Sequence, residues 1–183
     1  MIKELHRIVL RDLSWPEDRA PLLALDTSFT SDRVYRLQRT SRSFTLEEIA
    51  VSQSVYKSYP LASEIESLAS LDWVQVASDG REIVGVVGME VQPWNRRANL
   101  HHLYVEQAVR LRGIGRLLVE AALDEAHKRG ARSLWAETQA INYRAIGFYE
   151  RMGFEWSGLD TSLYDPAEVQ EGEVALFFSR VVA

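Results

Sequence analysis

The second half of the chain shows both of the hydrophobic spacings that distinguish helices from strands. Between residues 114 and 126, apolar side chains return every three or four positions and charged side chains fill the other positions, which predicts an amphipathic helix. Gly130 and Gly153 follow this stretch and a second one, YRAIGFYERM, and glycine is the residue that most often ends a helix. Asn142 directly precedes the second helix and is a favourable N-cap residue.

Strand-like stretches lie before, between and after these helices. Residues 72–93 predict a hairpin, because two apolar runs flank the turn dipeptide Asp79-Gly80. Seven further stretches are also expected to be strands, two of them within residues 27–59. In chain order they are 5–11, RVYRLQRTS (33–41), FTLEEIAVSQSVY (44–56), 98–107, 133–138, FEWSG (154–158) and EVALFFSRVV (173–182). Residues 15–26 predict a short helix with Pro16 in its first turn. This order predicts a single α+β domain over residues 1–183, with a mixed sheet and helices on its faces.

Composition narrows the range of functions. The 183 residues carry a net charge of −5, which argues against nucleic-acid binding and is compatible with a small cationic substrate. The absence of cysteine excludes disulfides and thiolate chemistry. We expect no metal site, because adjacent strand residues such as His101 and His102 point to opposite faces and the other two histidines are distant in sequence. No apolar run is long enough for a signal peptide or a membrane span, so we expect a cytoplasmic protein.

The segment RLRGIGR, residues 110–116, places two glycines and three arginines at the entrance to the first helix. Backbone N–H groups at a helix N-terminus bind anions where no side chain blocks access. The segment lacks the lysine of a P-loop, and Leu118 stands where a dinucleotide-binding fingerprint has its third glycine. A turn eased by glycines and lined with surface arginines is the simpler alternative.

Two segments resemble the signatures of the GNAT superfamily of N-acetyltransferases. The Arg-x-x-Gly-x-Gly of residues 110–115 resembles its pyrophosphate loop. The stretch 137–158 resembles its second signature, with Asn142, Phe148-Tyr149 and Gly153-Phe154 in order. The segments VYKSYP, WNRRANLHHLYV, AETQAIN and GLDTSLY are similar to the streptothricin acetyltransferases, which acetylate an amine of a cationic antibiotic. The resemblance implies a GNAT fold, with a central, mostly antiparallel sheet of about seven strands. One departure is Leu111, where many such loops carry glycine.

The resemblance also implies acetyl-CoA as co-substrate, with no metal, and assigns roles to individual residues. The residues expected to bind acetyl-CoA are Leu103, Tyr104, Val105, Arg110, Leu111, Arg112, Gly113, Ile114, Gly115, Arg116 and Asn142. Tyr149 is the expected proton donor to the departing thiolate, although a helix tyrosine is more often a packing residue. His101 is the expected base, because an unperturbed histidine titrates at a pKa of about 6.5 and His101 shares the strand parity of Leu103. Streptothricin acetyltransferases tend to carry glutamate at this place, and His101 can equally be an ordinary surface residue.

Asp160 and Tyr164 follow the strand after the second helix and are the expected contacts to the acceptor. An aspartate can hold an ammonium or guanidinium group, and a tyrosine can pack against it. A solvated turn before Asp165-Pro166 explains each residue singly just as well. The leading hypothesis is therefore an acetyl-CoA-dependent N-acetyltransferase for a small cationic amine. Acetylation of a peptide or protein amine and a non-catalytic acyl-CoA-binding module are the alternatives, and a homodimer is left open.

Overall fold

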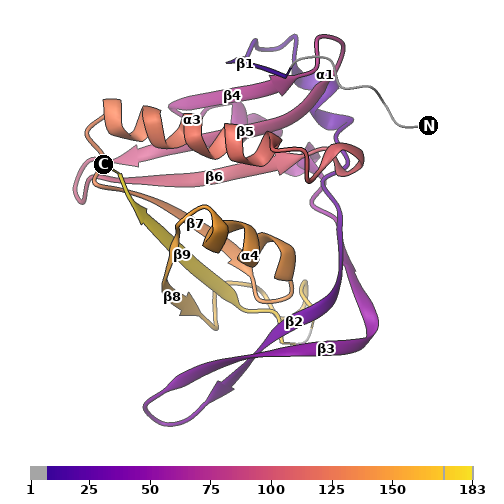
Figure 1. The fold of residues 1–183 in the computed structure, drawn as a ribbon, viewed down its shortest axis with the longest axis vertical. Coiled ribbons are helices and arrows are strands. Elements are labelled where there is room, and N and C mark those ends of the chain that lie inside the picture. The colour runs from indigo at the N-terminus through magenta and orange to yellow at the C-terminus, as the bar shows by residue number, and fades with distance from the viewer. Residues whose placement is uncertain (1–7, 171, 183) are drawn as a thin grey trace. The chain divides into compact units, whose positions relative to one another are not determined.

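The computed structural model describes residues 8–170 and 172–182, which form a seven-stranded and a two-stranded sheet with helices (Figure 1). The first sheet has the strand order β1-β4-β5-β6-β7-β9-β8, and β2 and β3 form the second. The strands are β1 Val9–Asp12, β2 Phe29–Arg39, β3 Phe44–Lys57, β4 Trp73–Ser78, β5 Ile83–Gln92, β6 Arg97–Val105, β7 Ser133–Gln139, β8 Glu155–Asp160 and β9 Ala175–Val181. The helices are α1 Arg19–Leu23, α2 Ile65–Ala69, α3 Ile114–Lys128 and α4 Tyr143–Arg151, with 3-10 turns η1 Leu61–Ser63 and η2 Gln107–Val109. The larger sheet is mixed, with one parallel pair, which confirms the predicted fold class.

The described chain divides into two compact units, each built from separate stretches of sequence. Unit 1 comprises residues 8–28, 58–134 and 181–182, and unit 2 comprises residues 29–57 and 135–180 without residue 171. Unit 1 therefore holds β1, β4, β5, β6, α1, α2 and α3, and unit 2 holds the β2–β3 hairpin, most of β7, α4, β8 and most of β9. A single domain over residues 1–183 stays a prediction.

Both faces of the unit 1 strands are covered by helices. On one face, Leu22 of α1 and Ile65 and Leu68 of α2 pack in a buried cluster with Val76 and Val86 of the sheet. Helix α3 lies across β4, β5 and β6 (Figure 1). Its buried positions are Ile114, Leu118, Val119, Ala122 and Ala126. Four of them belong to the predicted apolar stripe, whereas Leu117 of that stripe is 40% exposed and Val119 is buried outside it. Burial of such a stripe supplies most of the stability of a surface helix.

Gly85 explains how closely α3 approaches β5. A Cβ atom at this position would lie 3.1 Å from Leu118 Cδ1 and 3.0 Å from the carbonyl oxygen of Tyr104. A side chain here would push α3 away from the strand, because a close-packed interior leaves no room for an added methyl group. The α3 N-terminus is thereby held close above the end of β6.

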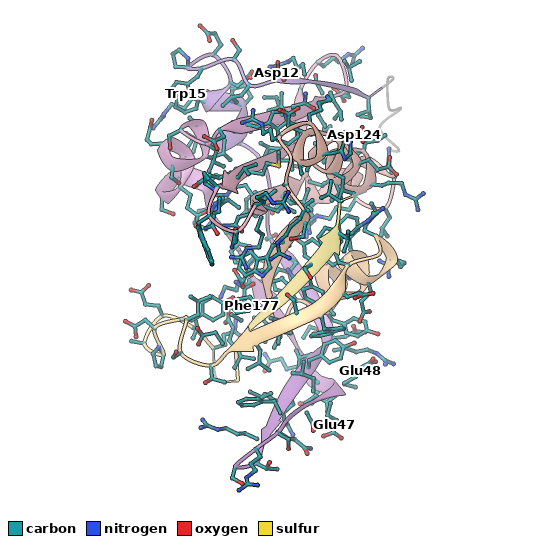
Figure 2. All side chains as sticks on the ribbon, turned by 90° about the vertical axis from the view of Figure 1, so that its left-hand side faces the viewer. Asp12, Trp15, Glu47, Glu48, Asp124 and Phe177 are labelled. Atoms are coloured by element: carbon teal, nitrogen blue, oxygen red, sulfur yellow. The ribbon has the colours of Figure 1, made fainter. Side chains whose placement is uncertain are left out.

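Unit 2 is organised around aromatic side chains. Tyr35 of β2 stacks on Tyr143 of α4 with ring centroids 5.8 Å apart and meets Trp156 of β8 edge-on, also at 5.8 Å. The Tyr35 amide donates to the carbonyl oxygen of Ala140 at 2.9 Å. A two-stranded hairpin is marginal alone in water, so these contacts stabilise the 11-residue and 14-residue strands of the ribbon. Figure 2 shows Glu47 and Glu48 on the outer part of this hairpin.

The predicted elements differ from the structure mainly at the N-terminal end. Residues 8–11 of the first predicted strand fall at or beside β1, and residues 5–7 lie outside the described residues. Helix α1 begins at Arg19 rather than at Pro16 and spans only five residues. The predicted turn at Asp79-Gly80 is a four-residue loop, in which Asp79 Oδ1 accepts hydrogen bonds from the amides of Arg81 and Glu82. Helices α3 and α4 end as predicted, with Gly130 and Gly153 at φ +72° and +77°.

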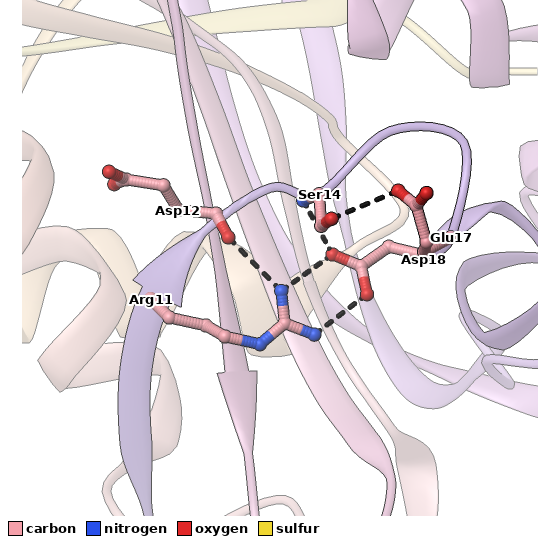
Figure 3. A network of polar contacts seen from close by, with 5 residues as sticks. All are labelled: Arg11, Asp12, Ser14, Glu17 and Asp18. Carbon is pink, nitrogen blue, oxygen red and sulfur yellow. Dashed lines mark hydrogen bonds and ion pairs between the residues drawn. The ribbon is translucent and has the colours of Figure 1, made fainter.

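A polar network joins β1 to α1 (Figure 3). Arg11 donates from Nη1 to Asp18 Oδ2 at 2.6 Å and from Nη2 to Asp18 Oδ1 at 2.7 Å. The amide of Ser14 donates to the same Oδ2 at 2.8 Å, and the Ser14 hydroxyl donates to Glu17 at 3.0 Å. Asp18 makes no side-chain N-cap bond to α1. The start of this short helix is therefore fixed by Arg11 rather than by capping.

Candidate functional site

The loop that precedes α3 contains two residues with positive φ values, a feature that many anion-binding turns share. Leu111 and Gly113, two residues apart, have φ values of +65° and +86°. Left-handed residues alternating with right-handed ones direct successive N–H groups into one concavity, which suits an anion. Position 113 favours glycine because of its positive φ value, which residues with a side chain rarely adopt. Lack of space is not the reason, because a Cβ atom there would meet no atom within 4 Å. Leu111 accepts the same strained conformation with its side chain 95% exposed.

The helix that follows adds a favourable electrostatic field. Helix α3 has 15 residues, Gly113 as its N-cap residue and no acidic side chain in its first turn. Its first N–H groups lack partners within the helix, and the macrodipole places partial positive charge there. Arg116 lies in this first turn and is exposed. The predicted pyrophosphate-binding residues 110–116 therefore come together at one helix N-terminus within unit 1.

Arg110 has a different environment from the one its place in the motif suggests. Its guanidinium donates to the carbonyl oxygens of Val105 at 2.9 Å, Ser28 at 2.6 Å and Asp26 at 3.3 Å. The expected role of Arg110 in acetyl-CoA binding stays a prediction.

The three other predicted cofactor residues of unit 1 end strand β6. Leu103, Tyr104 and Val105 are half-buried and pair with Val87, Val86 and Gly85 of β5. Leu103 shares a face with the position of Gly85 and hence with α3, whereas Tyr104 lies on the opposite face, beside Tyr59 at a ring distance of 6.3 Å. The main chain of this segment leads directly into the loop at 110–116.

The two histidines of β6 lie at an irregularity that breaks the expected alternation. His102 pairs with Gly88 and Leu100 pairs with Met89, so His101 is an extra residue in a β-bulge. His101 therefore cannot be assigned to a face by simple parity with Leu103. Its side chain is 42% exposed, and its Nε2 atom lies 3.6 Å from Glu90 Oε2. A bulge re-aims side chains in this way and leaves the imidazole open to solvent.

His102 is the buried member of the pair. Its side chain is 8% exposed, and Nδ1 is the one fully buried side-chain nitrogen or oxygen without a hydrogen-bond partner in the described part of the chain. Burial lowers the pKa of His102 from 6.5 to about 4, with a further lowering by His101. Glu64 Oε2 lies 3.5 Å from Nδ1, but this carboxylate is half exposed, so solvent screens its charge and desolvation dominates. The ring is neutral at pH 7 and is a weak base.

In unit 2, two predicted site residues, Asn142 and Tyr149, lie at the start of α4 and within it. Asn142 Oδ1 accepts a hydrogen bond from the Ala145 amide at 3.2 Å, so this side chain is the N-cap of α4 as the sequence predicts. Tyr149 is 7% exposed, and its ring lies 5.3 Å from that of Phe154 and 5.5 Å from that of Phe178. These ring contacts hold the side chain of Tyr149 in one orientation. Its phenol hydroxyl is the part of the side chain that can donate a proton.

A second group of polar side chains gathers in unit 2, and only one of its members is predicted from the sequence. The Tyr164 hydroxyl donates to Glu137 of β7, and Lys57 at the end of β3 pairs with Glu173. The Glu173 side chain is fully buried and that of Lys57 is 20% exposed. Burial raises the pKa of Glu137, against the opposing effects of the Tyr164 hydrogen bond and of Lys57. We call Glu137, Tyr164, Lys57 and Glu173 the carboxylate cluster.

Asp160 lies apart from these hydrogen bonds. Its Oδ1 accepts from both the amide and the hydroxyl of Ser162 at 2.7 Å, which is the arrangement of a solvated turn. The same hydrogen bonds lower the pKa of Asp160, so it is charged at neutral pH. Its role in acceptor binding stays a prediction.

Glu137, Lys57 and Glu173 escape prediction because they come together from three distant stretches of sequence. The one local signal is Glu137 itself, a carboxylate that directly follows the apolar run Leu-Trp-Ala in the strand SLWAET. Among the residues that the structure describes, no group of three or more histidines and carboxylates has the geometry of a metal site. The described helices are all too short or too polar to cross a membrane.

Comparison with known proteins relates both units to acetyltransferases. The family described as "Acetyltransferase (GNAT) family" matches residues 32–154. Streptothricin acetyltransferase of Streptomyces lavendulae is 35% identical over 172 residues, which cover 90% of each chain. The crystal structure of nourseothricin acetyltransferase has a TM-score of 0.86 at 36% identity and covers 96% of this chain and 99% of its own. A Bacillus anthracis str. Ames structure in complex with acetyl coenzyme A has a TM-score of 0.80 at 24% identity, with 96% of this chain and 99% of its own covered.

Proposed function

Because the chain belongs to the acetyltransferase (GNAT) family, we propose that it transfers the acetyl group of acetyl-CoA to an amine of a streptothricin-like acceptor. The observation that carries this proposal is similarity to streptothricin acetyltransferase over nine-tenths of both chains. Similarity of this extent includes the acceptor-side segments and is not limited to the cofactor-binding motif. The proposed acceptor is a small cationic amine.

The residues of unit 1 fit a bound pyrophosphate. The alternating positive φ values at Leu111 and Gly113 and the acid-free first turn of α3 are features of an anion site. Main-chain N–H groups of residues 111–116 are the proposed donors, and Arg116 supplies charge. The proposed site for the pantetheine is the main chain of Leu103, Tyr104 and Val105, in the manner of an added strand. Acetyl-CoA supplies the thioester acyl group, and these residues bind and orient it.

Two protons must move during the transfer, and each has a proposed residue. The acceptor ammonium must lose a proton before its nitrogen can attack, and His101 is the proposed acceptor of that proton, directly or through one water. Its exposure supports this role, whereas His102 has a pKa of about 4 and holds a proton poorly at neutral pH. Tyr149 Oη–H is the proposed donor to the departing thiolate. The aromatic contacts that fix its ring support a single hydroxyl position.

The carboxylate cluster supports a cationic acceptor. Its two carboxylates, Glu137 and Glu173, have one lysine among the contacts described above, so the cluster attracts positive charge. Tyr164, which the sequence predicts as an acceptor contact, hydrogen-bonds to Glu137. An ammonium group near Glu137 would favour its charged form and oppose the effect of burial on its pKa.

Thiol release from acetyl-CoA measures the proposed reaction directly. We expect turnover with streptothricin and far slower turnover with a peptide amine. In Tyr149→Phe, kcat should fall by about 10²–10⁴-fold, because loss of a positioned proton donor removes acid catalysis, while CoA affinity is retained. His101→Ala should remove the pH-dependent step near neutrality, and His102→Ala is the matched control that should keep it.

The outcomes separate the parts of the proposal. Turnover with a peptide amine alone would reject the antibiotic acceptor and retain the enzyme. Unaltered turnover in Tyr149→Phe would make Tyr149 a packing residue. CoA binding without release of thiol toward any amine would favour the non-catalytic binding module.

A further inference from the structure

Arg110 occupies the first position of the predicted pyrophosphate loop, where its positive charge suggests a phosphate ligand. Its contacts are of another kind. Three of its N–H groups donate to main-chain carbonyl oxygens, on Val105 at 2.9 Å, Ser28 at 2.6 Å and Asp26 at 3.3 Å. A planar guanidinium holds its donors in a fixed fork. Three of the five N–H groups, including that of Nε, are thus directed at carbonyl oxygens, so the guanidinium is not arranged for a two-point grip on phosphate through Nε and an Nη atom.

Glu106 also connects the segment before the loop to residues 26–28, which Arg110 contacts. Its Oε2 accepts from the Asp26 amide at 2.9 Å and its Oε1 accepts from the Ala108 amide at 3.4 Å. The Gln107 amide donates to the carbonyl oxygen of Asp26 at 3.2 Å. Both polar main-chain groups of Asp26 are therefore bonded to residues 106–110, the segment that leads into the loop.

Two residues of the attached segment are buried, since Thr27 is 6% exposed and Ser28 is 3% exposed, whereas Asp26 is exposed. The carbonyl oxygen of Ser28 therefore depends on its Arg110 partner, because an unsatisfied buried group is costly. The Thr27 hydroxyl donates in turn to the carbonyl oxygen of Tyr59 at 2.5 Å. Residues 26–28 lead into β2 and Tyr59 follows the end of β3. The contacts therefore fix the two points at which the chain leaves for the hairpin and returns from it.

We propose that Arg110 and Glu106 form a clamp, positioning residues that hold the acetyl-CoA loop in its binding conformation, and that Arg110 does not itself bind the pyrophosphate. The clamp anchors the chain immediately before Leu111 and Gly113, the two residues whose positive φ values shape the concavity. A loop held in this way is preorganised, so less conformational entropy is lost on binding. This inference rests on the proposed function, because it concerns how the loop for acetyl-CoA is held.

A substitution that keeps the charge of Arg110 distinguishes a residue that holds the loop in place from one that binds phosphate. Lysine keeps the charge of Arg110 and loses its fork, so Arg110→Lys and Arg110→Met should both weaken CoA binding by about tenfold or more, with kcat at saturating CoA nearly unchanged. Because no phosphate contact is lost, the salt dependence of the CoA Kd should stay that of wild type. Arg116 is the matched control: Arg116→Lys should bind CoA almost normally, and Arg116→Met should bind less tightly with a weaker salt dependence.

Calorimetry at two ionic strengths and hydrogen exchange measure these effects. In Arg110→Lys, amide exchange should accelerate both in residues 111–116 and in residues 26–28, an effect that loss of a phosphate ligand would not produce. Glu106→Gln leaves Arg110 intact and replaces one acceptor oxygen by a donor, so it should loosen the same two segments and weaken CoA binding. If the Arg110 variants do not fold, Glu106→Gln alone tests whether residues 106–110 hold the loop in place.

Wild-type affinity in Arg110→Lys, together with a weakened and less salt-dependent Kd in Arg110→Met, would overturn the proposal and make Arg110 a phosphate ligand. Wild-type exchange and affinity in Glu106→Gln would overturn it as well. Failure of the proposed function has a different signature: the unsubstituted protein would then bind no CoA, or would bind it and release no thiol with a streptothricin-like acceptor, whatever the Arg110 and Glu106 variants do.

Discussion

His102 shows how burial turns an ionisable side chain into a pH-dependent contribution to stability. Its pKa is 6.5 ordinarily and about 4 in the folded protein, so between these values the unfolded chain binds the proton more readily. The free energy of unfolding therefore falls as pH drops from about 6.5 to 4, by up to about 3 kcal/mol from this group. Above pH 6.5 the ring is neutral in both states and the cost disappears.

We predict that His102→Gln flattens the stability curve over this window. Glutamine is polar and does not titrate, so the variant should lose less stability than wild type between pH 6.5 and 4, whatever its stability at pH 7. Urea unfolding at intervals of half a pH unit measures the difference. His127→Gln is the control, because His127 is exposed on α3 and is not among the groups that shift the pKa of His102. Parallel curves for wild type and His102→Gln would show that the folded His102 can bind a proton after all.

For individual residues, prediction from sequence fails where the contacts of a side chain come from distant parts of the chain. The candidate site residues 110–116, Asn142 and Tyr149 are proposed from local motifs, because each motif consists of residues that are close together in the sequence. The Arg110 fork cannot, since its partners Asp26 and Ser28 lie more than 80 positions away. The carboxylate cluster is hidden for the same reason.

Elements are predictable where sequence and local geometry agree. Helices α3 and α4 each combine an apolar stripe with a glycine after the last turn, and both lie where the sequence places them. Helix α1 does not, because its start is determined by tertiary contacts of Asp18 rather than by Pro16 or an N-cap bond. The β-bulge at His101 is invisible in the sequence, since nothing in LHHLYV signals an extra residue.

The joint between β1 and α1 should depend on Asp18. The Arg11 guanidinium lowers the pKa of Asp18, and the hydrogen bond from Ser14 lowers it further, although burial opposes both. Asp18→Asn removes the charge and should lower the free energy of unfolding by about 1–2 kcal/mol at pH 7, a value discounted because Arg11 is two-fifths exposed. Glu17→Gln, at an exposed position, should change it by less than about 0.5 kcal/mol.

The pH dependence of this difference provides the check. A carboxylate with a lowered pKa stabilises the fold above its ordinary value of 3.8, and the contribution is lost as pH falls through the lower folded value. Wild type and Asp18→Asn should therefore converge in urea unfolding as the pH is lowered in steps below 3.8. A difference that stays constant over this acid range would mean that the substitution acts through packing rather than through the ion pair.

For the whole molecule, the net charge of −5 has a consequence for substrate encounter. A protein of net negative charge attracts a polycation from beyond contact distance, and salt screens that attraction over a Debye length of about 10 Å at 0.1 M. The carboxylate cluster adds a local source of the same sign in unit 2. The net charge would repel the proposed anionic co-substrate, acetyl-CoA, and the local field of the α3 N-terminus would oppose that repulsion.

We therefore predict that kcat/KM for a polycationic acceptor falls about tenfold or more between about 10 and 500 mM salt at saturating acetyl-CoA, because electrostatic steering enhances association by about 10–10³-fold. A monoamine acceptor of comparable size should show a much smaller decrease, since fewer charges are steered. Initial rates of thiol release at four or five salt concentrations give both slopes. Glu137→Gln should reduce the slope for the polycation and leave that for the monoamine nearly unchanged. Equal slopes for the two acceptors in wild type would show that the acceptor is recognised by shape and hydrogen bonding, without a contribution from the negative field.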